Sequence, residues 1–508
     1  MSFGHGTDEK FTTSSVPDVS VALSTQVKFT LLFVLCFAQF IDAFNNTAFI
    51  AAIPPIAQDL NISNSRSVWL LSGYQLTLAA LLLSSGRLSD LYNPKWVFVA
   101  GTLLMSLCAL GAGFVRSEIP LVVLRAFMGI GAALNIPSAM SLIIWLFPEP
   151  ATQSQALAAF ACAAGIGNVL GLITGALLVS FADWPWVLYF TTILTFILAI
   201  ATIALLPSKN IHIRDSIDGA LSMAQLKRLD PVGVSSLTIA LILFIFAVTS
   251  GSVDGWGTAQ VIAPLVLSVV LAVCFVFWEA HLPTTLAAVP PSMWKYPDFP
   301  ILIAVSLQPF MWWASVQLLF SWLYQEVYGW STIMAAVHFL PLGLITFPIM
   351  AIASTLQQRF PLKWIILFGQ VLALAGTVLL PFADSKERYW SLTLPGFILG
   401  SSGMLFVFTT TNIALFANTP PEVAGIVGAI FTCALQLENH GGPNGFYGRA
   451  AGFWFLFAFG AVEIIGVLAF MRRNAAPVKH TEEANIERIE ELEVKHSDKS
   501  LVELRDAE

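Results

Sequence analysis

The sequence predicts an all-helical membrane protein, and two observations support this fold class. Hydrophobic residues make up 57% of the 508 residues and charged residues only 11%, against about 25% charged in an average soluble protein. The charged residues are also clustered, and between them lie apolar stretches of about 20 residues, the length of a membrane-spanning helix. The net charge of −7 argues against nucleic acid as a partner. We therefore expect a lipid bilayer around most of the chain.

The intervals between charged residues define fourteen predicted spans. The first six are Lys28–Asp59, Arg66–Arg87, Lys95–Arg116, Glu118–Glu149, Glu149–Asp183 and Asp183–Lys209, and two more are Asp230–Asp254 and Asp254–Glu279. The last six are Asp298–Glu326, Glu326–Arg359, Lys363–Asp384, Arg388–Glu422, Glu422–Glu438 and Arg449–Arg472. The thirteenth is doubtful, because its 15 residues between the two glutamates make about 23 Å of helix, whereas the hydrocarbon core is about 30 Å thick. It is either an unwound segment or a deletion.

The distribution of basic residues places both chain ends in the cytosol. With a cytosolic N-terminus, 18 of the 24 Lys and Arg residues lie in cytosolic segments and 5 in outer loops, which follows the positive-inside rule. Asn61 begins an Asn-Ile-Ser sequon in an outer loop and is a candidate glycosylation site. Residues 1–27 contain three acids and do not resemble a cleavable signal peptide.

No pattern in the sequence indicates an enzyme. The five cysteines lack metal or disulfide spacing, and neither a nucleotide-binding loop nor a nucleophile elbow is present. We expect no metal and no cofactor.

The chain also repeats internally. A shift of 268 residues places Lys95-Trp96 on Lys363-Trp364 and maps the first six spans onto the last six. Two similar halves are typical of a transporter that rocks one half against the other. The predicted parts are a cytosolic segment 1–27, a six-helix bundle 28–206, a cytoplasmic linker 207–230, an inserted helix pair 231–279, a connector 280–298, a second six-helix bundle 299–472 and a charged cytosolic tail 473–508.

Three motifs lie on successive spans. Gly86–Asp90, followed by Lys95, resembles the loop motif of the major facilitator superfamily; Arg125–Ala133 resembles its span-4 motif, and Gly167–Ala176 its antiporter motif. Together with Ala51–Pro54 at the end of span 1, they resemble the fourteen-span drug:proton antiporter group, above all fungal exporters of natural products and toxins. The resemblance covers roughly residues 28–472. It implies the major facilitator fold, with two six-helix bundles and an inserted helix pair.

The motifs also depart from the family pattern. Leu172 stands in place of a proline, and Ala176 in place of the last glycine of the antiporter motif. The span-1 acid of the group falls on Asn45, while Asp42 lies one helical turn earlier on a similar face. The loop motif is weakened at Leu91, Asn93 and Pro94.

The resemblance assigns roles to two of these motifs. Gly86, Asp90 and Lys95 would form the conformational switch that holds the two halves together in one state; otherwise Asp90 is an ordinary interfacial acid. Gly167, Gly171 and Gly175 recur every four residues on one face of span 5, so two helices can approach closely there. By resemblance this contact opens and closes during transport; the alternative is static packing.

Three charged residues lie inside strong spans and are the proton-coupling candidates: Asp42, Arg125 and Glu463. A charge in the middle of a span costs about 2.5–3.5 kcal/mol on insertion scales. Asp42, in the middle of span 1, could carry a proton or be a structural carboxyl. Arg125 could sit beside a central cavity or extend its side chain toward the membrane surface. Glu463 is either a second proton relay or an acid in a wet helix contact.

Polar and aromatic residues within the spans form a possible substrate cavity, although each polar residue alone could equally bond one helix to another. The set is Asn45, Gln75, Asn135, Gln308, Trp312, Trp313, Gln317 and Asn412.

These features together predict a secondary transporter. We expect it to export a small organic metabolite, toxin or drug by proton antiport, with the proton gradient as energy source and alternating access as mechanism. We expect a monomer in the plasma membrane, with the vacuolar membrane as the alternative location. The alternative functions are proton-coupled uptake of a nutrient or siderophore, and a receptor or scaffold that does not transport.

Overall fold

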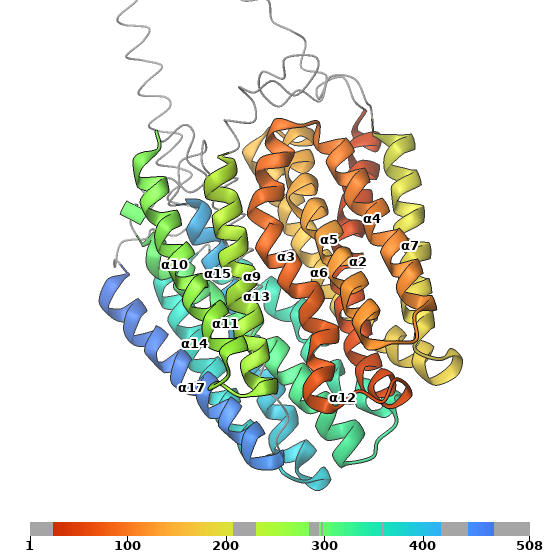
Figure 1. Ribbon diagram of the computed structural model, residues 1–508. Helices are drawn as coiled ribbons and strands as arrows, with labels where there is room; N and C mark the ends of the chain where they lie inside the picture. The colour runs from red at the N-terminus through yellow and green to blue at the C-terminus, as the bar shows by residue number, and fades with distance from the viewer. Residues whose placement is uncertain are drawn as a thin grey trace, which may run out of the picture.

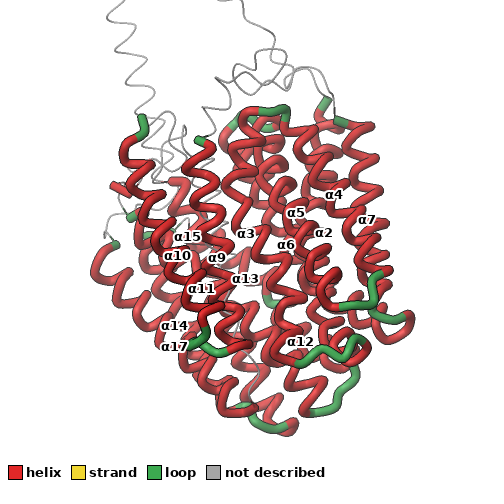
Figure 2. The backbone as a smooth tube through the Cα atoms, in the orientation of Figure 1, coloured by secondary structure: helices red, strands yellow, loops and turns green. Residues whose placement is uncertain are grey.

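The computed structural model describes residues 24–206, 230–283, 294–295, 298–357, 359–417 and 445–471. These residues form a bundle of long helices, and no strand occurs among them (Figures 1 and 2). The predicted all-helical fold class is confirmed.

The helices follow the order of the predicted spans. The N-terminal half contains α2 (Thr25–Asp59), α3 (Asn64–Leu91), α4 (Pro94–Phe114), α5 (Glu118–Leu146), α6 (Pro150–Ala182) and α7 (Pro185–Leu205). The inserted pair is α9 (Pro231–Asp254) and α10 (Ala259–His281). The C-terminal half contains α11 (Phe299–Trp322), η2 (Leu323–Val327), α12 (Thr332–Leu344), α13 (Thr346–Gln357), α14 (Leu362–Leu379), η3 (Leu380–Phe382), η4 (Lys386–Arg388), η5 (Tyr389–Thr393), α15 (Leu394–Ala417) and α17 (Gly445–Phe470).

Twelve membrane spans in the described residues are long and apolar enough to cross a bilayer. Predicted span 2 corresponds to α3, which is not among the twelve but packs against α5 and α9 within the bundle. Predicted span 10 is divided into α12 and α13 at Ile345. The doubtful span 13 and the linker residues 207–229 lie outside the described residues, as do residues 1–23 and the tail 472–508.

Local sequence explains where α4 begins. The Asn93 side chain accepts a hydrogen bond from the Lys95 backbone N–H at 3.0 Å, and Pro94 occupies the first turn of α4. An asparagine cap followed by proline is a strong helix start, because both satisfy the geometry of the first turn. Two of the three residues that weaken the loop motif, Asn93 and Pro94, therefore have a local structural role.

Two lysines at equivalent positions of the repeat make equivalent contacts. Lys95 Nζ donates to the backbone oxygens of Ile203, at 3.2 Å, and Leu206 at the end of α7. Lys363 Nζ donates in the same way to Leu468, at 3.1 Å, and Met471 at the end of α17. A cation there satisfies carbonyls that the helix leaves unpaired and complements the helix dipole. Each lysine thus ties the first helical turn of one span to the last turn of another.

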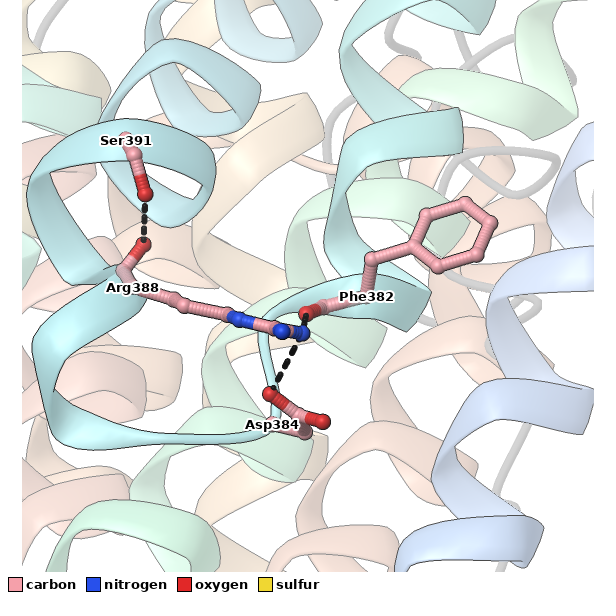
Figure 3. Close-up of polar contacts among 4 residues, drawn as sticks. All are labelled: Phe382, Asp384, Arg388 and Ser391. Atoms are coloured by element: carbon pink, nitrogen blue, oxygen red, sulfur yellow. Dashed lines mark hydrogen bonds and ion pairs between the residues drawn. The ribbon is translucent and has the colours of Figure 1, made fainter.

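The loop between α14 and α15 contains one ion pair. Arg388 donates to the Asp384 carboxylate at 2.9 Å and to the Phe382 carbonyl at 3.1 Å, while its own carbonyl accepts from Ser391 (Figure 3). Both charged side chains are largely exposed, so the pair contributes at most about 1 kcal/mol. Its role is to shape the loop between α14 and α15.

The two halves meet along α6 and α12 and between α2 and α11, while α9 of the inserted pair packs on α3. Leu318 and Trp322, near the C-terminal end of α11, belong to the buried apolar cluster of the N-terminal half. Cys162 on α6 lies 3.7 Å from Met350 on α13, measured between the sulfur atoms. The Ser84 and Thr238 hydroxyls, 3.1 Å apart, join α3 to α9.

Candidate functional site

The first feature of the candidate site is a carboxyl in the middle of α2. The Tyr74 hydroxyl on α3 donates a hydrogen bond to Asp42 Oδ1. Tyr74 is fully buried, whereas Asp42 is partly exposed. The acid is therefore anchored by Tyr74 and remains partly exposed.

Arg125 on α5 completes the site. Its Nε donates to the Leu70 carbonyl and one terminal nitrogen donates to Asn45 Oδ1, both at 3.2 Å. Its guanidinium carbon lies 3.8 Å from the ring centroid of Phe49 and 4.8 Å from that of Tyr74. Such cation–π contacts are worth about 2 kcal/mol or more when desolvated. Arg125 thus connects α5 to α2 and α3.

Arg125 is fully buried, and its guanidinium is held by Leu70 and Asn45 inside the N-terminal half. Its guanidinium interacts electrostatically with Asp42, and its second terminal nitrogen has no hydrogen-bond partner among the described residues. A buried cation is tolerated only when hydrogen bonds and a nearby negative charge offset the loss of water, as Asn45, Leu70 and Asp42 do here. Two of the three predicted charges therefore lie in one site.

Tyr74 was not among the sequence candidates, although it connects both charges. Its neighbour Gln75 was predicted as a cavity residue. The signal that could have identified Tyr74 is a hydroxyl group in the middle of predicted span 2. Asn45 takes the position of the group's acid, and it contacts Arg125 through its amide oxygen. The charge that faces Arg125 is instead on Asp42, one turn earlier.

Polar side chains continue along one partly exposed face of α2. Gln39, Asp42 and Asn46 share this face at helical spacing and are all partly exposed. Gln75 is buried, and its amide donates to Asn46 Oδ1 at 2.9 Å. We call Gln39, Asp42 and Asn46 the polar stripe.

One partly exposed face of α11 carries aromatic and polar side chains. Phe310, Trp313 and Gln317 are partly exposed. The Phe310 ring centroid lies 5.7 Å from that of Trp313 and 5.8 Å from that of Phe408 on α15. Trp313 Nε1 donates to Ser401 Oγ at 3.1 Å, which fixes the ring. We call Phe310, Trp313 and Phe408 the aromatic face.

Other predicted cavity residues hold helices together instead. Asn135 Oδ1 accepts from Thr102 at 3.1 Å, across α5 and α4. Trp312 is fully buried, and its Nε1 donates to Thr377 Oγ1 at 2.8 Å. Gln308 is also buried. The Asn412 side chain lies outside the described residues.

The predicted switch motif lies at the end of α3. Gly86 is in the helix, and the side chain of Asp90 lies outside the described residues. Lys95, in the first turn of α4, is buried, and its Nζ contacts the end of α7 in the same half of the molecule. Asn61, the glycosylation candidate, is exposed in the turn after α2 with φ of 53°.

The glycine face of α6 lies directly against α2. A Cβ on Gly167 would lie 2.4 Å from the Phe40 carbonyl oxygen, one on Gly171 would lie 2.3 Å from Thr47 Oγ1, and one on Gly175 would lie 2.5 Å from the Ala48 carbonyl oxygen. Real side chains do not approach so closely, so only glycine fits at these positions. The polar stripe is carried by the helix that this face contacts.

Glu463 lies apart from Asp42 and Arg125. It is on α17, at the edge of the bundle opposite to α2 and α7 (Figure 1). Its Oε2 accepts a hydrogen bond from Gln370 on α14 at 3.1 Å.

Comparison with known proteins decides the family. The sequence model of the Major Facilitator Superfamily matches residues 35–437 of this chain. The chain belongs to the major facilitator superfamily. Among its relatives in this superfamily, a puromycin resistance protein of Streptomyces alboniger is 29% identical over 80% of this chain and 78% of that protein.

Other relatives of this major facilitator transporter are named for different transported compounds or directions of transport. A low affinity ammonium transporter of Saccharomyces cerevisiae is 27% identical over 78% of this chain and 76% of that protein. The efflux pump terJ of Aspergillus terreus is 25% identical over 85% and 84%. A solved peptide transporter POT superposes with a TM-score of 0.63 at 14% identity, covering 87% of this chain and 95% of the other. That likeness supports the fold alone.

Proposed function

We propose that this transporter exports a small organic compound in exchange for protons, and that Asp42 exchanges the proton. The observation that carries the proposal is the position of Asp42. This carboxyl is partly exposed in the middle of a span, with Tyr74 and Arg125 on its buried side. Intramembrane acids in such positions are typical of proton pathways.

The geometry supports a simple coupling step. When ionised, Asp42 accepts from Tyr74 and offsets the charge of Arg125. A proton on Asp42 removes that negative charge, so the site changes from nearly neutral to cationic. A bound substrate that carries positive charge is then repelled. Proton entry from outside and substrate release to the outside are thereby linked through one site.

The substrate would lie between the polar stripe and the aromatic face. The stripe provides amide groups and one acid, and the face provides three large rings. This combination fits an organic molecule with an apolar or aromatic part and a polar or cationic group. The relatives named as a puromycin resistance protein and an efflux pump support export of such compounds.

The test is proton-driven transport of puromycin in vesicles containing the purified protein. With an imposed pH gradient, we expect the wild type to accumulate puromycin, and Asp42→Asn and Arg125→Ala to lose the component that depends on the gradient. Asp183→Asn is the matched control, because Asp183 is an exposed acid at the end of α6, and asparagine removes its charge at nearly the same size and shape. Unchanged gradient-dependent transport in both site variants would contradict the assignment.

A second candidate function is uptake driven by the same proton site. The relative named as a low affinity ammonium transporter is the observation that favours it. Methylammonium added to the same vesicles distinguishes the two functions: proton-coupled symport would carry it in the direction of proton flow. We place the protein in the plasma membrane, which a fluorescent fusion in a fungal cell can test.

A further inference from the structure

Glu463 lies in a small polar cluster inside the C-terminal half. Its Oε2 accepts from the Gln370 amide at 3.1 Å. A Cβ on Gly460, one turn before Glu463 on α17, would lie 2.2 Å from Gln308 Nε2 on α11. The three side chains are 6%, 0% and 1% exposed, in the order Glu463, Gln370 and Gln308. Three helices therefore bring one acid and two amides together away from water.

Three side-chain oxygens in this cluster have no hydrogen-bond donor among the described residues. Glu463 Oε1, Gln370 Oε1 and Gln308 Oε1 are each buried without a hydrogen-bond partner in the described part of the chain. Buried polar atoms are rarely left in this state, because each loses its hydrogen bonds to water. The cluster thus lacks at least one donor.

Charged residues of the surrounding helices do not supply that donor. The sequences of α11 and α15 contain no charged residue, and that of α14 contains only Lys363. Lys363 is bound to the carbonyls of Leu468 and Met471 at the end of α17. Arg449, on α17 itself, is 14 residues from Glu463, which is about 21 Å along a helix. An ionised Glu463 would therefore be a buried charge without a counter-charge among the described residues, which proteins avoid.

We propose that Glu463 holds one proton throughout the transport cycle and pairs with Gln370 as a neutral acid. Its Oε1–H donates to Gln370 Oε1, and its Oε2 accepts from Gln370 Nε2. This one proton lets Glu463 Oε1 and Gln370 Oε1 bond to each other, so two of the three unpaired oxygens gain a partner. The pair joins α17 to α14, and α11, α14 and α17 all belong to one half of the molecule. A rocking motion between the halves leaves this proton in place.

This inference goes beyond the proposed function, since it assigns a bound proton that is not exchanged. It also separates Glu463 from Asp42, which lies on α2 in the other half of the molecule. Asp42→Asn can therefore remove coupling while the Glu463 pair remains, and the two proposals can fail independently.

The test compares Glu463→Gln, Glu463→Leu and Gln370→Leu in purified full-length protein. Glutamine can donate and accept at the same two positions, so we expect Glu463→Gln to keep the thermal unfolding midpoint and the gradient-dependent puromycin transport of the wild type. Both leucine variants leave polar atoms unpaired and should lower the midpoint. Infrared difference spectra of wild type against Glu463→Gln should show the loss of a protonated carboxyl band whose intensity does not change between mildly acidic and mildly alkaline buffer.

Two results would overturn the proposal. Loss of gradient-dependent transport in Glu463→Gln, with an unchanged unfolding midpoint, would make Glu463 an exchanging relay. Loss of an ionised carboxylate band in the difference spectrum, in place of the protonated band, would show a carboxylate paired with a cation. The exchange Gln370→Glu with Glu463→Gln is the positive control, because it rebuilds the same acid–amide pair with its partners reversed.

Discussion

Tyr74 has two separable contacts at the candidate site. Its hydroxyl donates to Asp42, and its ring lies against the Arg125 guanidinium at 4.8 Å. The first contact holds the carboxyl in place, and the second stabilises the buried cation. One side chain therefore connects the group that exchanges the proton to the group that balances its charge.

We predict that Tyr74→Phe and Tyr74→Leu reduce proton-driven transport to different degrees. Phenylalanine removes only the hydrogen bond to a charged group, worth about 1.5–3 kcal/mol, whereas leucine also removes the ring over Arg125, worth about 2 kcal/mol. The rate of gradient-dependent puromycin transport should fall from wild type to Tyr74→Phe and further in Tyr74→Leu. Equal rates in all three proteins would show that Tyr74 has no part in the coupling.

At the scale of helices, the contact between α2 and α6 sets how closely the polar stripe is held. The glycine face of α6 brings the backbone of α2 within contact distance, with the Phe44 carbonyl oxygen 2.6 Å from a Cβ placed on Gly171. Small residues at four-residue spacing are how membrane helices approach without a hydrophobic driving force. Leu172, which replaces the family proline, leaves α6 as one continuous helix from Pro150 to Ala182.

We predict that Gly171→Ala destabilises the protein and that Gly165→Ala does not. Alanine at 171 would place Cβ 2.3 Å from Thr47 Oγ1, whereas alanine at 165, on the same helix, would meet the Thr346 methyl group at 3.4 Å, close to ordinary contact. Overpacking of this kind costs about 1–3 kcal/mol. The thermal unfolding midpoint in detergent measures the difference, and similar midpoints for the two variants would refute the close packing of α2 on α6.

The sequence predicted the helical fold class and the order of the spans, because the length of an apolar run is set by the bilayer. It also indicated Asp42 and Arg125, since charges inside spans are rare. It could not predict that Tyr74 joins them, because that contact depends on how α3 rotates against α2. Nor could it separate Trp313, partly exposed, from Trp312, fully buried one residue earlier. Adjacent residues on a helix point in different directions, and the packing of the helix in the bundle decides which of the two side chains is buried.

At the scale of the whole molecule, the contact between α6 and α13 crosses from one half to the other. Cys162 and Met350 meet there, with their sulfur atoms 3.7 Å apart. Alternating access requires such contacts to change as one half rocks against the other. A covalent link at this point would therefore hold the two halves in a single arrangement.

We predict that cross-linking Cys162 to Met350→Cys stops transport. The variant keeps Cys162, carries alanine at the other four native cysteines and is treated with a short bifunctional thiol reagent whose product a reductant cleaves. Gradient-dependent puromycin transport should disappear on cross-linking and return after reduction, while the same protein with Met350 intact should be unaffected by the reagent. Normal transport by fully cross-linked protein would mean that α6 and α13 stay together throughout the cycle, so the moving contact would lie elsewhere between the halves.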